Sequence, residues 1–185
     1  ALGGAVSGRK DLIRALNSEA AIHYGGVLSP FNAWLIARGC ATLPLRMKAH
    51  GETAQRVAEW LEGKADVARV IFPGLASHPQ YELAQRQMNG PSAMIAFQVG
   101  DRATGEHVAK RMMSELEVIH YAVSLGHHRS LIFWMGTDEL LSSSFKLTDA
   151  GARSYRDFAG DGIFRLSVGL EDSEDLINDL GNVLG

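Results

Sequence analysis

The 185-residue sequence contains a single cysteine, Cys40, so an intrachain disulfide is excluded and a reducing compartment is favoured. No apolar run approaches the ~20 residues that a membrane-spanning helix needs. The first ten residues lack the charged and apolar segments of a signal peptide. The net charge is −3 and lysine occurs at only five positions, so no basic stripe is present for a nucleic acid. These absences predict a cytoplasmic protein with neither a membrane nor a nucleic-acid partner.

Common site motifs are also missing. The glycine-rich stretches "GGAVSG" (3–8) and "YGGVLSP" (24–30) match neither a dinucleotide-binding fingerprint nor a P-loop, and close backbone packing explains their glycines equally well. His127 and His128 have no acidic or cysteine partner at metal-site spacing, which favours a solvated loop over a metal site. Internal repeats and low-complexity segments are absent.

What is present is an ordinary globular composition, 46% apolar and 21% charged, arranged in two regimes. Residues 1–45 are rich in glycine and small apolar residues. We expect a strand over 2–7, a helix over 10–16, and a helix over 30–38 that Ser29 caps and Gly39 closes. Cys40 is expected to be a buried residue at the end of that helix. The sequence has no initiator Met and begins like a strand in progress, which suggests a truncated or cleaved chain.

A more charged regime with a clear helical period begins near residue 44. A long helix that ends at Gly63 should connect the two regimes, with the boundary near residues 42–62. Its apolar face is expected to consist of Met47, Ala54, Val57, Ala58 and Leu61.

Strands and helices then alternate along the chain. We expect strands over 68–72, 93–99, 118–123 and 163–168, and helices over 80–88, 103–115 and 148–158. A last helix should begin near Asp172, with an apolar stripe of Leu176, Ile177, Leu180 and Val183 or Leu184. This order predicts an α+β sandwich in which helices cover one face of the sheet.

Arg165 stands out within the last expected strand. Phe164, Leu166 and Val168 alternate as a buried face, so Ile163, Arg165, Ser167 and Gly169 belong to the opposite face. An outward arginine on a one-sided sheet is usually just solvated. The alternative is a planar guanidinium that holds a ligand carboxylate bidentately.

Two further stretches can each be interpreted either functionally or structurally. In "AVSLGHHRSLI" (122–132), a strand ends at Ser124-Leu125-Gly126, where backbone N–H groups could point outward, although such turns are abundant. The acids Glu171, Asp172, Glu174 and Asp175 resemble a catalytic cluster. They fall at the start of a helix, where negative charge is stabilising, so we assign them to structure.

Four stretches together resemble the carboxyl-terminal portion of the trans-sulfuration family of pyridoxal-phosphate enzymes. This family includes methionine γ-lyase, cystathionine γ-lyase, cystathionine γ-synthase and O-acetylhomoserine sulfhydrylase. The stretches occur in the family's order and spacing and cover nearly the whole chain. They are "VLSPFNAWLIARGCATLPLRM" (27–47), "VIFPGLASHPQYELAQRQM" (70–88), "AVSLGHHRSLI" (122–132) and "GIFRLSVGLEDSEDLINDL" (162–180).

The resemblance implies a type I pyridoxal-phosphate transferase fold, α/β overall, of which this chain is mostly the α+β small domain with an antiparallel sheet covered by helices. Residues 1–45 would end the large cofactor-binding domain, 46–62 would be a connecting helix, and 63–185 would be the small domain. The family is implied to form a homotetramer, a dimer of dimers, with the apolar segment 23–31 as a candidate buried contact.

The resemblance also implies site residues. The arginine that holds the substrate carboxylate corresponds to Arg165, and the serine that assists it corresponds to Ser124, beside Leu125 and Val123. The cofactor is pyridoxal 5'-phosphate. None of the five lysines has the context of the family's Schiff-base lysine, which is therefore expected upstream of Ala1. The chain alone would then be inactive and would need the amino-terminal portion of the same protein.

Departures from the family pattern bear on the reaction. The stretch "FWMGTDELLSSSF" (133–145) replaces a family segment whose threonine contributes to the substrate region. Its counterpart could be Thr137 or one of Ser142, Ser143 and Ser144. Val123 is aliphatic where cystathionine-cleaving members often have glutamate, which favours an apolar substrate side chain. We therefore expect a C–S lyase that acts by γ-elimination on a methionine- or cystathionine-like amino acid. The alternatives are γ-replacement on an acylhomoserine by a synthase or sulfhydrylase, or a non-catalytic assembly domain.

Overall fold

The computed structural model describes residues 1–184, which form two compact units, one of residues 1–45 and one that begins at residue 46. In the described part of the chain, no helix is both long enough and apolar enough to cross a bilayer.

The first unit contains helix α1 (Lys10–Leu16), a π-helical segment η1 (Asn17–His23) and helix α2 (Pro30–Ala41). The expected helix over 10–16 is confirmed. The cap of α2 is also confirmed, because the Ser29 side chain accepts a hydrogen bond from the Asn32 N–H at 3.3 Å and Pro30 opens the helix.

Three expectations for this unit are wrong. Residues 2–7 form no strand, since the glycines there lower strand propensity and no neighbouring strand exists among the described residues of the unit. Gly39 lies inside α2, which continues for two residues and ends at Ala41. Cys40 is exposed instead of buried, because no residue of α2 is packed into a core.

Helix α3 (Leu43–Glu62) provides one wall of the second unit's core. Its buried face includes Ala54, Val57, Ala58 and Leu61, as expected, but Met47 is 43% exposed because the buried face begins only at His50. The helix ends where expected: the Gly63 N–H donates to the carbonyl oxygens of Glu59 and Trp60.

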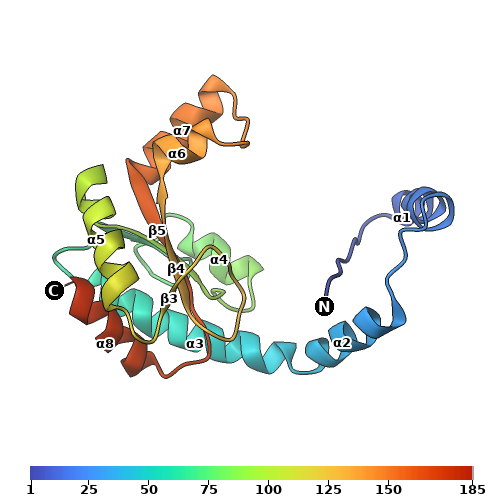
Figure 1. Cartoon of the computed structure of the whole chain (residues 1–185), viewed down its shortest axis with the longest axis horizontal. Helices are drawn as coiled ribbons and strands as arrows, with labels where there is room; N and C mark the ends of the chain where they lie inside the picture. The colour runs from blue at the N-terminus through green and yellow to red at the C-terminus, as the bar shows by residue number, and fades with distance from the viewer. Residues whose placement is uncertain (185) are drawn as a thin grey trace. The chain divides into compact units, whose positions relative to one another are not determined.

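A five-stranded sheet lies at the centre of the second unit (Figure 1). Its spatial order is β1-β2-β5-β4-β3, and the bounds are β1 (Arg69–Ile71), β2 (Met94–Gln98), β3 (His120–Tyr121), β4 (Leu131–Gly136) and β5 (Gly162–Ser167). The four expected strands are confirmed, the third in shortened form, and β4 was missed.

The sheet is mainly antiparallel, as expected, with one parallel pair at its edge. β1, β2, β5 and β4 pair antiparallel, but β3 pairs parallel with β4. Parallel neighbours usually need a long crossover. Here β3 has only two residues, so the short loop 122–130 can bring the chain back to the start of β4.

Helices α5 (Arg102–Glu115) and α8 (Ser173–Leu184) lie together on one side of the sheet (Figure 1). The remaining helices are α4 (Tyr81–Gln87), α6 (Thr137–Ser142) and α7 (Asp149–Ala159). The expected stripe of α8 is confirmed, since Leu176, Leu180, Val183 and Leu184 are buried and Ile177 packs against the core. α6, like β4, was not expected.

The side chains of strand β5 alternate between the two faces of the sheet, which have different surroundings. Phe164, Leu166 and Val168 are fully buried, and the Phe164 ring stacks on Phe97 with centroids 5.2 Å apart. Arg165 and Ser167 alternate with them and so belong to the opposite face. The strand therefore anchors one face in the core and presents Arg165 on the other.

Candidate substrate-binding site

Arg165 lies in the middle of the sheet, between Ala96 of β2 and Phe133 of β4. Its side chain is half-buried, and its Nη2 donates to the backbone oxygen of Ser124 at 3.3 Å. Its Nε is buried and has no hydrogen-bond partner among the described residues. Buried guanidinium nitrogens are normally paired, so an unsatisfied donor indicates a partner that this chain does not supply.

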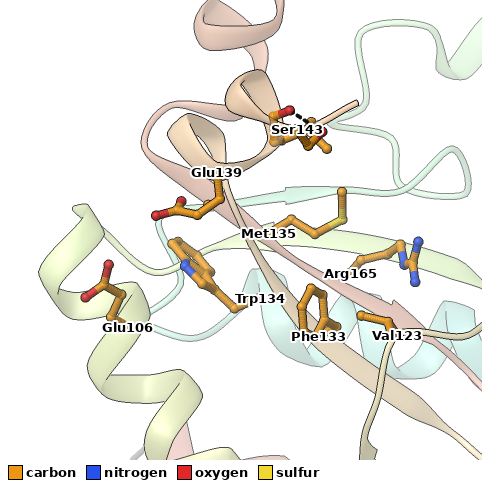
Figure 2. Close-up of a pocket in the computed structure, with 10 residues that line it drawn as sticks. Glu106, Val123, Phe133, Trp134, Met135, Glu139, Ser143 and Arg165 are labelled. Atoms are coloured by element: carbon orange, nitrogen blue, oxygen red, sulfur yellow. Dashed lines mark hydrogen bonds between the residues drawn. The ribbon is translucent and has the colours of Figure 1, made fainter. Parts of the chain in front are cut away.

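Arg165 lines a cavity of about 550 Å³, a size typical of small-molecule sites. Val123, Phe133 and Met135 are grouped around Arg165 (Figure 2). Phe133 also contacts the Tyr121 ring, with centroids 5.6 Å apart. The complete lining consists of Glu106, Val123, Phe133, Trp134, Met135, Gly136, Glu139, Leu140, Ser143 and Arg165. The surroundings of Arg165 are therefore apolar, as expected of a site that holds a carboxylate away from water.

Two carboxylates, Glu106 and Glu139, line another part of the cavity, and both form ion pairs with Arg102. The Arg102 guanidinium also reaches Asp138 at 3.1 Å, and Asp138 pairs with Arg156 at 2.8 Å. The hydrogen bond from Arg156 lowers the pKa of Asp138 below its usual value. This exposed network compensates the negative charge at that side of the cavity.

The structure brings together three of the four residues predicted for substrate binding. Arg165 and Val123 line the cavity, and Ser124 contacts Arg165 through its backbone oxygen. Leu125 is 57% exposed and does not line the cavity. Their role in substrate binding stays a prediction.

The candidates for the family's threonine lie in different environments. Thr137 is fully buried, and its hydroxyl donates to the Gly160 oxygen at 2.7 Å, so it supports the start of α6. The Ser142 hydroxyl donates to the backbone oxygen of Glu139. Ser143 lines the cavity, although its hydroxyl donates to the Leu140 oxygen. Ser143 is thus the candidate best placed to meet a substrate.

The acids at the start of α8 serve structure, as expected. The Asp172 carboxylate accepts from the Glu174 N–H at 2.8 Å, and Glu174 pairs with Arg56 at 2.6 Å. Glu171 accepts from the backbone N–H and the hydroxyl of Ser130. His127 and His128 are exposed in the loop, with ring centroids 4.0 Å apart.

Sequence reasoning missed the contribution of β4 to the site. Phe133 and Met135 flank Arg165 because β4 pairs with β5 in register, with Phe133 opposite Arg165 and Met135 opposite Ile163. The hydroxyl of Tyr121 accepts from the Trp134 N–H at 3.3 Å, and burial raises the pKa of Tyr121. The apolar run Leu131–Met135 next to the loop was the signal that could have revealed this strand.

A pyridoxal-phosphate cofactor is bound covalently through a lysine. None of the five lysines lines the cavity: four are exposed, and Lys64 lies over the Trp60 ring at 4.5 Å. The described residues therefore fit the carboxylate of an amino acid but not the covalent attachment of the cofactor.

These features define a half-buried arginine with an unsatisfied Nε, on a sheet beside a largely apolar cavity. The family described as Cys/Met metabolism PLP-dependent enzyme matches residues 1–185. The chain belongs to this family of pyridoxal-phosphate enzymes.

Three similar proteins illustrate the relationship. A canavanine gamma-lyase from Rhizobium leguminosarum bv. trifolii is 45% identical over the whole chain, which covers 44% of that relative. An L-methionine gamma-lyase from Porphyromonas gingivalis is 42% identical over 97% of the chain and 43% of the relative. The crystal structure of cystathionine gamma synthase from Xanthomonas oryzae pv. oryzae superimposes with a TM-score of 0.78 at 37% identity, covering 97% of this chain and 44% of that one. The chain thus spans less than half the length of these proteins and has the fold of their matching portion.

Proposed function

We propose that the protein to which this chain belongs is a pyridoxal-phosphate-dependent lyase that cleaves a bond at the γ-carbon of an amino acid. The observation that carries this proposal is Arg165, whose unsatisfied Nε and half-buried guanidinium lie at an apolar cavity in a chain of this family. Residues 1–45 would be the end of the cofactor-binding domain. A companion portion of the protein would supply the lysine, since the chain covers only 44% of its relatives.

Within this reaction the chain binds and orients the substrate. The Arg165 guanidinium would hold the α-carboxylate, with Ser124 and Val123 beside it. The cofactor, when bound, acts as an electron sink for bond cleavage at the substrate. Holding the carboxylate fixes the α-carbon in one orientation, which is this chain's contribution to rate.

The apolar surroundings of Arg165 favour a methionine-like substrate. Val123, Phe133 and Met135 offer no charged group to a substrate side chain, and a thioether can be buried there without an unmet hydrogen bond.

A second substrate class has its own support. Glu106 and Glu139 line the same cavity, and both already bind the Arg102 guanidinium, so these carboxylates can pair with a guanidine-type group there. A relative named canavanine gamma-lyase is 45% identical. L-canavanine, whose γ-carbon is bonded through an oxygen to a guanidine-type group, is therefore the second candidate substrate.

Location and assembly belong to the same proposal. The single cysteine favours a reducing, cytoplasmic compartment. Helix α2 exposes Phe31 and Trp34 at 66% and 55%, an apolar surface suited to burial in a homotetramer built from dimers. Light scattering that shows a stable and fully active monomer would contradict this assembly.

The test uses the full-length protein with its cofactor. Incubation with L-methionine should release methanethiol, and incubation with L-canavanine should release hydroxyguanidine, each detected by mass spectrometry. γ-Replacement would instead be supported if the protein formed a thioether from an acylhomoserine and cysteine but released neither methanethiol from L-methionine nor hydroxyguanidine from L-canavanine. A protein without cofactor absorbance and without any of these products would be an assembly domain.

A further inference from the structure

The loop 122–130, which carries Val123 and Ser124, is attached to the end of β5 by side-chain hydrogen bonds. Arg165 contributes one weak link to this loop, from Nη2 to the Ser124 oxygen at 3.3 Å. A shorter link lies two residues further along the same strand, where the Ser167 hydroxyl oxygen accepts from the Gly126 N–H at 2.9 Å.

Ser167 is well placed to hold this loop. It is 1% exposed and lies on the same face of β5 as Arg165, since residues two apart in a strand share a face. Its partner Gly126 has φ +71, a left-handed conformation that glycine adopts without strain. The bond therefore fixes the loop at the turn that directly follows Ser124 and Leu125.

A second attachment fixes the other end of the loop. The buried Ser130 hydroxyl accepts from the Gly169 N–H at 2.8 Å and donates to Glu171 at 2.8 Å, while the Ser130 N–H donates to the same carboxylate at 2.7 Å. This arrangement leaves no room for a side chain at Gly169, where an added Cβ would collide with His128, Ser130 and Glu171.

The strand end is itself fixed from the core. His50 of α3 is buried, and its Nδ1 lies 2.8 Å from the oxygens of both Val168 and Gly169. Because both partners are carbonyl oxygens, Nδ1 carries the proton and donates. Ser167 and Glu171 thus connect the loop to a segment that the core holds rigidly.

We propose that Ser167 is a positioning residue for the carboxylate site: its bond to the Gly126 N–H sets the distance between the Ser124 turn and the Arg165 guanidinium. Ser167 does not itself touch the substrate. The inference rests on the proposed function, because it assumes that an amino-acid carboxylate occupies the space beside Arg165.

The experiment compares Ser167→Ala with wild type in the full-length holoenzyme, using L-methionine, or L-canavanine if methionine is not cleaved. Loss of one neutral hydrogen bond should raise KM by about 3- to 10-fold. The value of kcat should stay within about twofold, because positioning the carboxylate affects ground and transition states alike. The second variant, Glu171→Gln, loosens the other attachment and should raise KM in the same way. Ser114→Ala, on the exposed surface of α5, is the matched control and should change neither constant.

Two measurements separate positioning from a general loss of structure. 3-(Methylthio)propylamine, or agmatine's oxy analogue for canavanine, lacks the carboxylate, so its inhibition constant should be unchanged by Ser167→Ala. In an Arg165→Lys background, Ser167→Ala should have almost no further effect on KM, since residues that act through one site are not additive.

Three results would overturn the inference. They are an unchanged KM in Ser167→Ala, an equal rise in the inhibition constant of the carboxylate-free amine, and full additivity with Arg165→Lys. Failure of the proposed function would look different: the wild-type holoenzyme would cleave neither amino acid, and the inference would then fall with it.

Discussion

Replacement of Arg165 by lysine keeps the positive charge at the site but removes the planar fork. In the structure, Arg165 reaches Ser124 through Nη2, and its buried Nε has no partner among the described residues. A lysine ammonium is a point charge on a flexible stem, so it cannot place two parallel donors against a carboxylate. The variant therefore tests geometry and leaves the sign of the charge unchanged.

The expected loss of kcat/KM in Arg165→Lys follows from the hydrogen-bond donors of the guanidinium that the substitution removes. A hydrogen bond to a charged group contributes about 1.5–3 kcal/mol, which corresponds to roughly 10- to 150-fold in kcat/KM. The loss should appear mainly in KM, because the carboxylate is bound in the ground state and in the transition state alike. Steady-state kinetics of the full-length holoenzyme with L-methionine and L-canavanine measure it, and cofactor absorbance should be unchanged.

A matched control is available on α7. Arg153 is exposed, so Arg153→Lys should leave kcat/KM within about twofold, as is usual for surface substitutions. If Arg165→Lys behaved like Arg153→Lys, Arg165 would be an ordinary solvated residue of the sheet and the proposed carboxylate site would be wrong.

The remaining predictions concern stability, measured from urea unfolding of the full-length protein. Asp179→Asn should destabilise by about 1.5–3 kcal/mol, because the buried carboxylate accepts from the N–H groups of residues 117, 118 and 119, whereas exposed Asp175→Asn should have little effect. Gly105→Ala should destabilise by about 1 kcal/mol despite its better helix propensity, since the added Cβ would collide with the Trp134 ring; a gain in stability would refute this. Tyr155→Phe should be neutral or stabilising by up to about 1 kcal/mol, because the Tyr155 hydroxyl is buried without a partner among the described residues. Burial raises the pKa of Tyr155, so the wild type should lose stability as pH rises above about 10 and the variant should lose less; a marked loss in Tyr155→Phe at neutral pH would indicate a partner outside this chain.

Elements with a strong local signal were predictable from the sequence. The sequence of α8 contains three signals of one helix: the capping residue Asp172, the acids of the first turn and an apolar stripe. The structure has this helix at Ser173–Leu184. In β5, the alternation of Phe164, Leu166 and Val168 against Arg165 identified both the strand and its buried face. Each of these signals depends only on neighbouring residues.

Elements that depend on distant partners were not predictable in the same way. The parallel pairing of β3 with β4 depends on how the loop 122–130 folds back, which no periodicity encodes. The stretch 2–7 has apolar residues but no strand with which to pair among the described residues of its unit, and Cys40 lies on a helix with no buried residue. An apolar composition predicts burial only where a second element supplies the other surface.

The candidate site was likewise only partly predictable, because it too depends on residues that are distant in the sequence. Periodicity placed Arg165 on the face opposite the core but could not distinguish a solvated arginine from a ligand-binding one. The structure adds the register that sets Phe133 beside Arg165, the cavity next to both, and the unsatisfied Nε. Phe133 and Met135 were missed because their contribution arises from strand pairing between residues about 30 positions apart.

The other charges around the cavity determine whether Arg165 can bind an anionic group. Glu106 and Glu139 line the same cavity and, if uncompensated, would oppose the entry of any anionic group. Arg102 pairs with both, and the hydrogen bond and charge of these acids raise its pKa further, so the Arg102 guanidinium stays charged at any physiological pH. Arg165 has no acidic partner among the residues that the structure describes; its guanidinium donates to the backbone oxygen of Ser124. Because the acids are compensated and Arg165 is not, the positive charge at this end of the cavity is available to an incoming carboxylate.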